Sequence, residues 1–135
     1  MVYRRNPKNP VRHQPDRRKR DLYAEIFGAL AIPRVFLNLE HVASAAPAGE
    51  ALFESVFVEH LQRFHQATDQ AKTRAEIEEA YHNRPDKKEN VLAPIEDQCR
   101  WLRDIGFADI DCFFKVFESA MFEGRKRSNR VQPAR

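Results

Sequence analysis

The sequence predicts an α/β fold in which three main strands, the last two paired as an antiparallel hairpin, are combined with a helical insertion. Three observations support this prediction. A short apolar run lies at 35–39, long segments with helical periodicity occupy 48–82, and residues 96–126 have the pattern of a helix followed by two strands. A chain of 135 residues has room for one domain with a modest core.

The first regular element is expected at about 16–30. Residues 1–15 contain three prolines among charged side chains, so we expect this segment to be irregular. After it, Leu22, Ile26 and Leu30 recur every four residues, which is typical of the apolar face of a helix.

The second element is a short strand, Val35–Leu39, which begins after Pro33. Its nearly continuous apolar sequence is typical of a parallel strand that is buried on both faces. Residues 43–49 are rich in Ala, Ser, Pro and Gly, and they predict a loop.

Two helices are expected in the insertion at about 48–82. The first has apolar residues with helical periodicity over about 48–67. Thr73 and Glu76 have the spacing of a capping box, which predicts a second helix at about 74–82. A polar loop follows at 83–93.

The last helix is expected to begin after Pro94 and to end at Gly106, because glycine adopts the left-handed conformation that closes a helix. The strand that follows has apolar side chains on both faces, which predicts that both are covered. We expect one face to hold Ile110, Cys112, Phe114 and Val116, and the other Asp111, Phe113, Lys115 and Phe117.

Positive charge is concentrated at the two ends of the chain. Residues 1–20 contain eight Lys or Arg and one acid, and residues 125–135 contain five and no acid. Residues 21–124 hold ten basic and nineteen acidic side chains, a net charge of −9. One alternative function is therefore a small interaction or nucleic-acid-binding protein that uses its basic termini. Solvated, poorly ordered ends would explain the same pattern.

Composition also limits the compartment and the metal chemistry. No apolar run approaches the ~20 residues of a membrane helix, and the basic N-terminus has no signal-peptide core, so we expect a cytoplasmic protein without a membrane partner. Cys99 and Cys112 are expected to be reduced thiols, with a disulfide or a metal pair as the alternative. His60 and His65 lie five residues apart, which does not suit one metal ion on a helix.

Two segments carry a family resemblance. Residues 17–43, RRKRDLYAEIFGALAIPRVFLNLEHVA, and residues 96–126, EDQCRWLRDIGFADIDCFFKVFESAMFEGRK, resemble the C-terminal end of class I S-adenosylmethionine-dependent methyltransferases. In that family the last two strands form an antiparallel hairpin beside an otherwise parallel, Rossmann-like sheet. The resemblance implies the C-terminal half of such a domain at 16–126, between a basic segment at 1–15 and a basic tail at 127–135.

The resemblance also implies S-adenosylmethionine as the cofactor and an unknown methyl acceptor. The family holds this cofactor with a Gly-rich turn after its first strand, and with an acid after its second. No two of the four glycines of this chain are close enough to form that turn, so we expect a truncated, inactive fragment that binds little cofactor by itself. Arg34 stands where the family has a glycine, so the preceding turn must differ or carry strain.

Six residues are candidates for a functional site. Glu40 and His41 follow the strand, where open α/β sheets bind ligands, and they are candidates for proton transfer. His13 is implied as a cofactor contact by the resemblance. In the loop after the insertion, Arg84, Asp86 and Asn90 are candidates for substrate contact, as part of a lid that the family's insertions imply. For each, the alternative is a local structural role or an ordinary exposed position.

A sheet that lacks its earlier strands would leave Val35–Leu39 with an open, apolar edge. Such an edge offers unpaired backbone groups to another strand. We therefore expect self-association or association with a separate N-terminal half.

Overall fold

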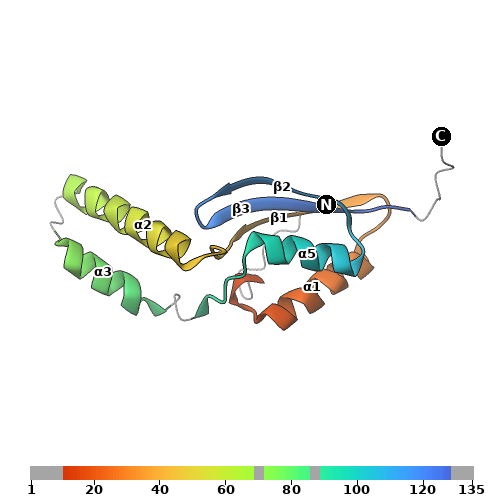
Figure 1. The fold of residues 1–135 in the computed structure, drawn as a ribbon, viewed down its shortest axis with the longest axis horizontal. Helices are drawn as coiled ribbons and strands as arrows, with labels where there is room; N and C mark the ends of the chain where they lie inside the picture. Colours follow the sequence, from red (N-terminus) through yellow and green to blue (C-terminus); the bar gives the residue numbers. More distant parts are fainter. Residues whose placement is uncertain (1–10, 69–71, 86–88, 129–135) are drawn as a thin grey trace.

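The computed structural model describes residues 11–68, 72–85 and 89–128, and it has a mixed α/β fold (Figure 1). A turn of 3₁₀ helix, η1, precedes the first α-helix. The helices are α1 (Asp16–Ala29), α2 (Pro47–Ala67), α3 (Arg74–Asn83) and α5 (Ile95–Ile105), and the strands are β1 (Arg34–His41), β2 (Ala108–Val116) and β3 (Ser119–Lys126), with η1 at Val11–His13.

The three strands form one sheet in the order β1-β3-β2. β3 is antiparallel to both neighbours, so β1 and β2 run in the same direction and only the last strand is reversed. The predicted terminal hairpin is therefore confirmed. The prediction that β1 is a buried parallel strand is wrong for the described residues, because β1 lies at the edge of the sheet and pairs only with the antiparallel β3.

Local sequence signals set the ends of several helices. α5 ends at Gly106, which has a φ of 115°, and the Phe107 amide donates a hydrogen bond to the Leu102 carbonyl at 3.0 Å. Thr73 and Glu76 form the predicted capping box at the start of α3. Arg34 lies within β1 and has no positive φ, so the turn before the strand differs from the glycine-containing turn of the family.

The core lies between one face of the sheet and the helices α1 and α5, which pack side by side below the strands in Figure 1. Phe36 of β1 and Phe122 of β3 project into it from the sheet, and Tyr23 and Leu102 project from the helices. Trp101 is buried there as well. Cys99 and Cys112 are free thiols.

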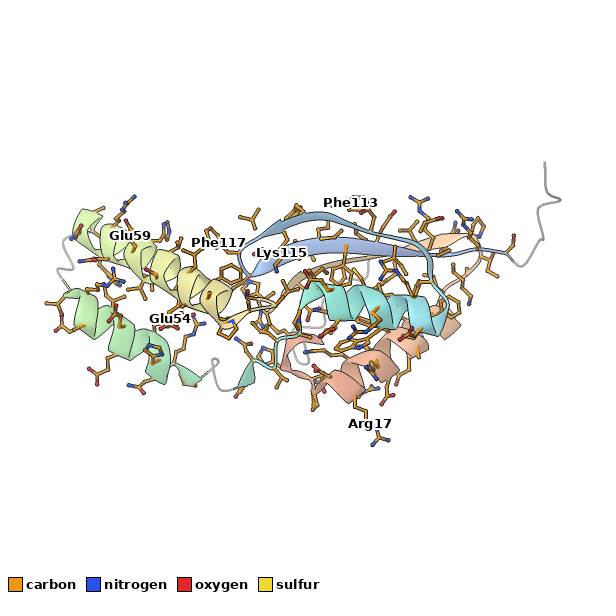
Figure 2. All side chains as sticks on the ribbon, viewed as in Figure 1. Arg17, Glu54, Glu59, Phe113, Lys115 and Phe117 are labelled. Atoms are coloured by element: carbon orange, nitrogen blue, oxygen red, sulfur yellow. The ribbon has the colours of Figure 1, made fainter. Side chains whose placement is uncertain are left out.

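The opposite face of the sheet, which we call the outer face, is open in the described structure. Cross-strand partners share a face, and Leu39, Met121 and Phe114 form a row there. Figure 2 shows Phe113 on the side of the sheet away from α1 and α5, and 53% of it is exposed. The apolar residues of the outer face are Val35, Leu37, Leu39, Phe113, Phe114, Val116 and Met121.

The expectation that β2 is covered on both faces is therefore wrong for the described chain. The prediction that the side chains of β2 alternate strictly between the two faces is wrong as well. The register of β2 with β3 shifts between Ala108 and Asp111 and again between Cys112 and Phe114. These irregularities place Cys112 opposite the core residue Phe122, and Phe114 opposite Met121 on the outer face. A bulge of this kind cannot be deduced from alternation alone.

Helices α2 and α3 form an arm that projects from the end of the sheet (Figure 1). They contact each other through a small apolar cluster of Val58, Ile77 and Tyr81. His60 is exposed on the surface of α2. Four large apolar side chains of α2 are also exposed, namely Leu52, Val56, Phe57 and Phe64.

Candidate functional site

A groove of about 350 Å³ lies where the arm meets the sheet, at the carboxyl end of β1. The last residue of β1, the middle of α2 and the turn between β2 and β3 form its walls. Ligand sites of open α/β sheets occur at this end of the strands. The groove is lined by His41, Phe53, Val56, Phe57, His60, Val116, Phe117, Glu118 and Ser119.

The walls of the groove are mainly aromatic. Phe53 on α2 and Phe117 in the hairpin turn contact each other edge to face, with ring centroids 5.3 Å apart. Phe57, one helical turn beyond Phe53, packs on Tyr81 of α3 with centroids also 5.3 Å apart. These contacts join the arm, the hairpin turn and the groove into one surface, which Figure 2 shows at Phe117.

The polar rim is formed by β1 and the hairpin turn. His41 Nδ1 lies 4.0 Å from Glu118 Oε2. The Val42 amide donates a hydrogen bond to the Glu118 carbonyl at 2.7 Å, which fixes the turn against the end of β1. Phe117 has a φ of 50°, a left-handed conformation that makes the tight reversal. An imidazole near a carboxylate can accept a proton from a bound hydroxyl or amine.

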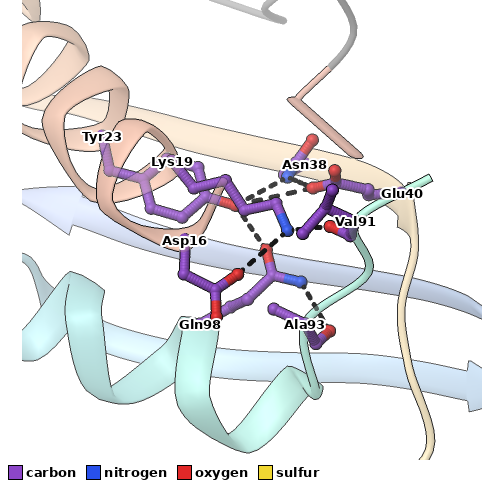
Figure 3. Close-up of polar contacts among 8 residues, drawn as sticks. All are labelled: Asp16, Lys19, Tyr23, Asn38, Glu40, Val91, Ala93 and Gln98. Carbon is purple, nitrogen blue, oxygen red and sulfur yellow. Dashed lines mark hydrogen bonds and ion pairs between the residues drawn. The ribbon is translucent and has the colours of Figure 1, made fainter. Parts of the chain in front are cut away.

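Glu40 and His41 do not form one site. Successive side chains of a strand point to opposite faces, so Glu40 points into the core side while His41 lines the groove. Figure 3 shows Glu40 in a buried polar network that joins β1, α1 and α5. Its Oε2 accepts a hydrogen bond from Asn38 Nδ2 at 2.9 Å, and the Tyr23 hydroxyl lies 3.5 Å away.

The rest of the network is anchored to α5 and to the loop before it. The Tyr23 hydroxyl donates to Gln98 Oε1 at 2.5 Å, and Gln98 Nε2 donates to the Ala93 carbonyl at 3.1 Å. The Lys19 ammonium, which is completely buried, contacts the Val91 carbonyl and pairs with Asp16 at 3.3 Å. The network fixes the helices against the sheet and does not open into the groove lining.

Burial raises the pKa of the Glu40 carboxyl above its ordinary value of 4.5, against the opposing effects of the Asn38 hydrogen bond and the Lys19 charge. Its Oε1 is buried without a hydrogen-bond partner among the described residues. Because the folded state holds this proton more tightly than the unfolded state, folding is favoured at acid pH. Stability is lost as the pH rises from 4.5 through the raised pKa.

We therefore expect Glu40→Gln to raise the free energy of unfolding by about 1 kcal/mol at pH 8, because the amide needs no buried charge. The gain should shrink toward zero at pH 4, where the native carboxyl is protonated. Urea unfolding at both pH values measures the difference. Glu59→Gln, on the surface of α2, is the matched control and should show no such pH dependence. A loss of stability at pH 8 in Glu40→Gln would contradict this account.

The other predicted site residues lie away from the groove lining. His13 accepts a hydrogen bond from Arg12 Nε at 2.8 Å, and its Nδ1 lies 3.6 Å from Glu89. Arg84 is part of the arm, where its guanidinium lies 4.3 Å from the ring centroid of Tyr81. Asn90 has a buried Oδ1 near the end of the loop, and Asp86 lies outside the described residues.

Glu118 and the three phenylalanines of the groove were not predicted as site residues from the sequence. Phe53 and Phe57 carry a recognisable signal, since aromatic residues at i and i+4 on a helix form one wall. Glu118 carries none, because its position beside His41 depends on the register of β3 against β1.

Many of the basic residues that the structure describes near the two ends have structural partners. Arg20 lies over the Trp101 ring at 5.0 Å, and the Lys126 ammonium donates to the Phe27 carbonyl at 2.7 Å. Arg127 binds Asp109 through two hydrogen bonds. Nucleic-acid binding by the termini stays a prediction, and residues 1–10 and 129–135, which carry part of that charge, lie outside the described structure.

No group of His, Cys, Asp or Glu in the described residues has the arrangement of a metal site, and no described helix is long and apolar enough to cross a membrane. No protein-family model matches the chain, and a search of curated proteins finds no match.

Proposed function

We propose that this chain is the acceptor-side half of a domain of the class I S-adenosylmethionine-dependent methyltransferase type. The observation that supports the proposal most is the direction of the strands, because β1 and β2 run together and only the terminal β3 is reversed. This matches the terminal hairpin that the sequence resemblance implies. The groove at the carboxyl end of β1 supports it as well, since that is the substrate side of such a sheet.

In this proposal the groove takes the methyl acceptor. The α2 wall is the insertion between the strand and the final helix, and it supplies the aromatic side chains Phe53 and Phe57. His41 stands at the polar rim beside Glu118, and it accepts the proton that the acceptor's oxygen or nitrogen must lose. The position of the acceptor against the walls determines its alignment.

The described residues do not fit the cofactor. They include no Gly-rich turn between a strand and a helix, and no acid at the end of an adjacent parallel strand. His13, the implied cofactor contact, is partnered by Arg12 and Glu89. We therefore assign cofactor binding to a separate segment that pairs with β1.

The open edge of β1 is the attachment point that this proposal requires. In the described structure β1 is hydrogen-bonded to β3 on one side only, and its edge carries the apolar run Val35–Leu39. A strand from a separate N-terminal half would extend the sheet there. Alternatively, the β1 edges of two copies of this chain would pair with each other.

Calorimetry with S-adenosylmethionine tests the assignment of the cofactor to another segment. The chain alone should give no saturable heat up to millimolar cofactor, because the residues that would hold the ribose and the methionine group are not among those described. Micromolar affinity of the isolated chain would overturn the proposed division. Circular dichroism on the same sample confirms that the protein is folded.

A further inference from the structure

The groove has the shape and surface of a site for one aromatic ring. Its volume of about 350 Å³ lies at the small end of the range for ligand pockets. Phe53 and Phe117 meet at a right angle, and Phe57 adds a third ring to the wall. An incoming ring that lies parallel to one of the Phe53 and Phe117 rings is perpendicular to the other, which is the face-to-edge arrangement that aromatic pairs favour.

The charge of the lining selects for a cation. Glu118 is its one acid, His41 and His60 are titratable, and no Lys or Arg is among the lining residues. A carboxylate or phosphate ligand would have no permanently charged partner there and would face Glu118. Residues 21–124, which include the groove, carry a net charge of −9, and this charge also attracts cations.

The rings of the arm already hold one cation within the chain. The guanidinium of Arg84 lies 4.3 Å from the ring centroid of Tyr81 and 5.6 Å from that of Phe57. These distances are within the range of favourable cation–π contacts. Phe57 is also part of the groove lining, whereas Arg84 is not. The aromatic surface from which the groove is built thus binds positive charge.

We propose that the groove binds an arylalkylamine, a small molecule that carries a protonated amine on a short chain from an aromatic ring. The ring packs among Phe53, Phe57 and Phe117, and the ammonium group pairs with Glu118 beside His41. The role of this amine as a methyl acceptor rests on the proposed function, whereas its binding does not. In that role, one ammonium proton passes to the imidazole of His41, which leaves the nitrogen lone pair free.

Titrations of the full chain with three matched probes test the proposal by nuclear magnetic resonance. The probes share a phenyl ring and differ in charge: 2-phenylethylamine is a cation, 2-phenylethanol is neutral and 3-phenylpropionate is an anion. We expect the amine to bind about tenfold more tightly than the alcohol, and the propionate to bind most weakly. Amide shifts should be confined to the groove residues and their neighbours.

Two variants separate the charge of the groove from the charge of the arm. Glu118→Gln should weaken amine binding about tenfold and leave alcohol binding unchanged. Its backbone carbonyl still accepts the Val42 hydrogen bond, so the turn is kept. Glu59→Gln removes an acid from α2, outside the groove, and it should leave the affinities for all three probes unchanged.

Three results would overturn the proposal: no saturable amine binding at 10 mM, equal affinity for amine and propionate, or no effect of Glu118→Gln. These outcomes are distinct from failure of the proposed function. If the groove binds the amine but an assembled domain binds no cofactor, the proposed amine site is supported and the proposed methyltransferase function is contradicted. If an assembled domain binds the cofactor but the groove binds no amine, the proposed function is supported and the proposed amine site is contradicted.

Discussion

Replacing Phe122 by alanine will lower the free energy of unfolding by about 4 kcal/mol, which is a large fraction of the roughly 5–15 kcal/mol that stabilises a natural domain. Phe122 lies on the middle strand of the sheet, is fully buried, and faces the core between the sheet and the helices. Truncation leaves a cavity bounded by two strands and two helices that cannot collapse without moving the sheet. Urea unfolding followed by circular dichroism measures the loss.

The matched variant on the other face is Phe113→Ala. Phe113 lies on β2, and more than half of its surface is exposed on the outer face. We expect its free energy of unfolding to stay within about 0.5 kcal/mol of the parent protein. Equal losses for Phe122→Ala and Phe113→Ala would show that the outer face is packed in solution, and would contradict the one-sided core.

Replacing Tyr23 by phenylalanine will lower the free energy of unfolding by about 2 kcal/mol. The ring stays in the core, but Gln98 Oε1 loses its 2.5 Å hydrogen bond and remains buried. An unsatisfied buried acceptor costs about 1–3 kcal/mol, more than the average hydrogen bond contributes. Burial, with the nearby Glu40, raises the pKa of the Tyr23 hydroxyl well above 10, so the loss should be constant from pH 6 to pH 9.

A double-mutant cycle identifies the cause of that loss. Combining Tyr23→Phe with Gln98→Leu removes both partners of the hydrogen bond. The sum of the stability losses of the two single variants should therefore exceed the stability loss of the double variant by at least about 1 kcal/mol. Strict additivity would mean that the hydroxyl stabilises the fold by another route. Calorimetric unfolding of the four proteins provides the values.

Local signals predicted most of the elements in this chain. The left-handed Gly106, the capping box at Thr73 and the apolar spacing of α1 depend on neighbours in the sequence, and each is present in the structure. The faces of the sheet could not be predicted this way. They depend on two register shifts in β2 and on the placement of helices on one side only. These are properties of tertiary packing, which overrides simple alternation.

Only the part of the candidate site that depends on local sequence was predicted. His41 was identifiable because it ends a strand, and strand ends are where open sheets bind ligands. Its neighbour Glu40 is directed to the opposite face by the alternation of the strand, and it stabilises the helix–sheet contact instead. Glu118 and Phe53 approach His41 only after the hairpin and the arm have packed, which no local pattern records.

Two features of the described structure are typical of a sheet that continues beyond these strands. β1 presents an unpaired apolar edge, and the outer face leaves seven apolar side chains without a covering helix. Large exposed apolar surfaces usually mark contact sites. The proposed function places an adjoining strand on the edge, and it thereby gives that surface a partner.

The most direct test of this account is a calorimetric titration of S-adenosylmethionine into a polypeptide that joins the upstream-encoded segment to this chain. The account predicts that this segment encodes a strand with a Gly-rich turn, and that the joined polypeptide binds the cofactor with micromolar affinity while the chain alone does not. An upstream segment without that turn, or a folded joined polypeptide that gives no saturable heat, would contradict it.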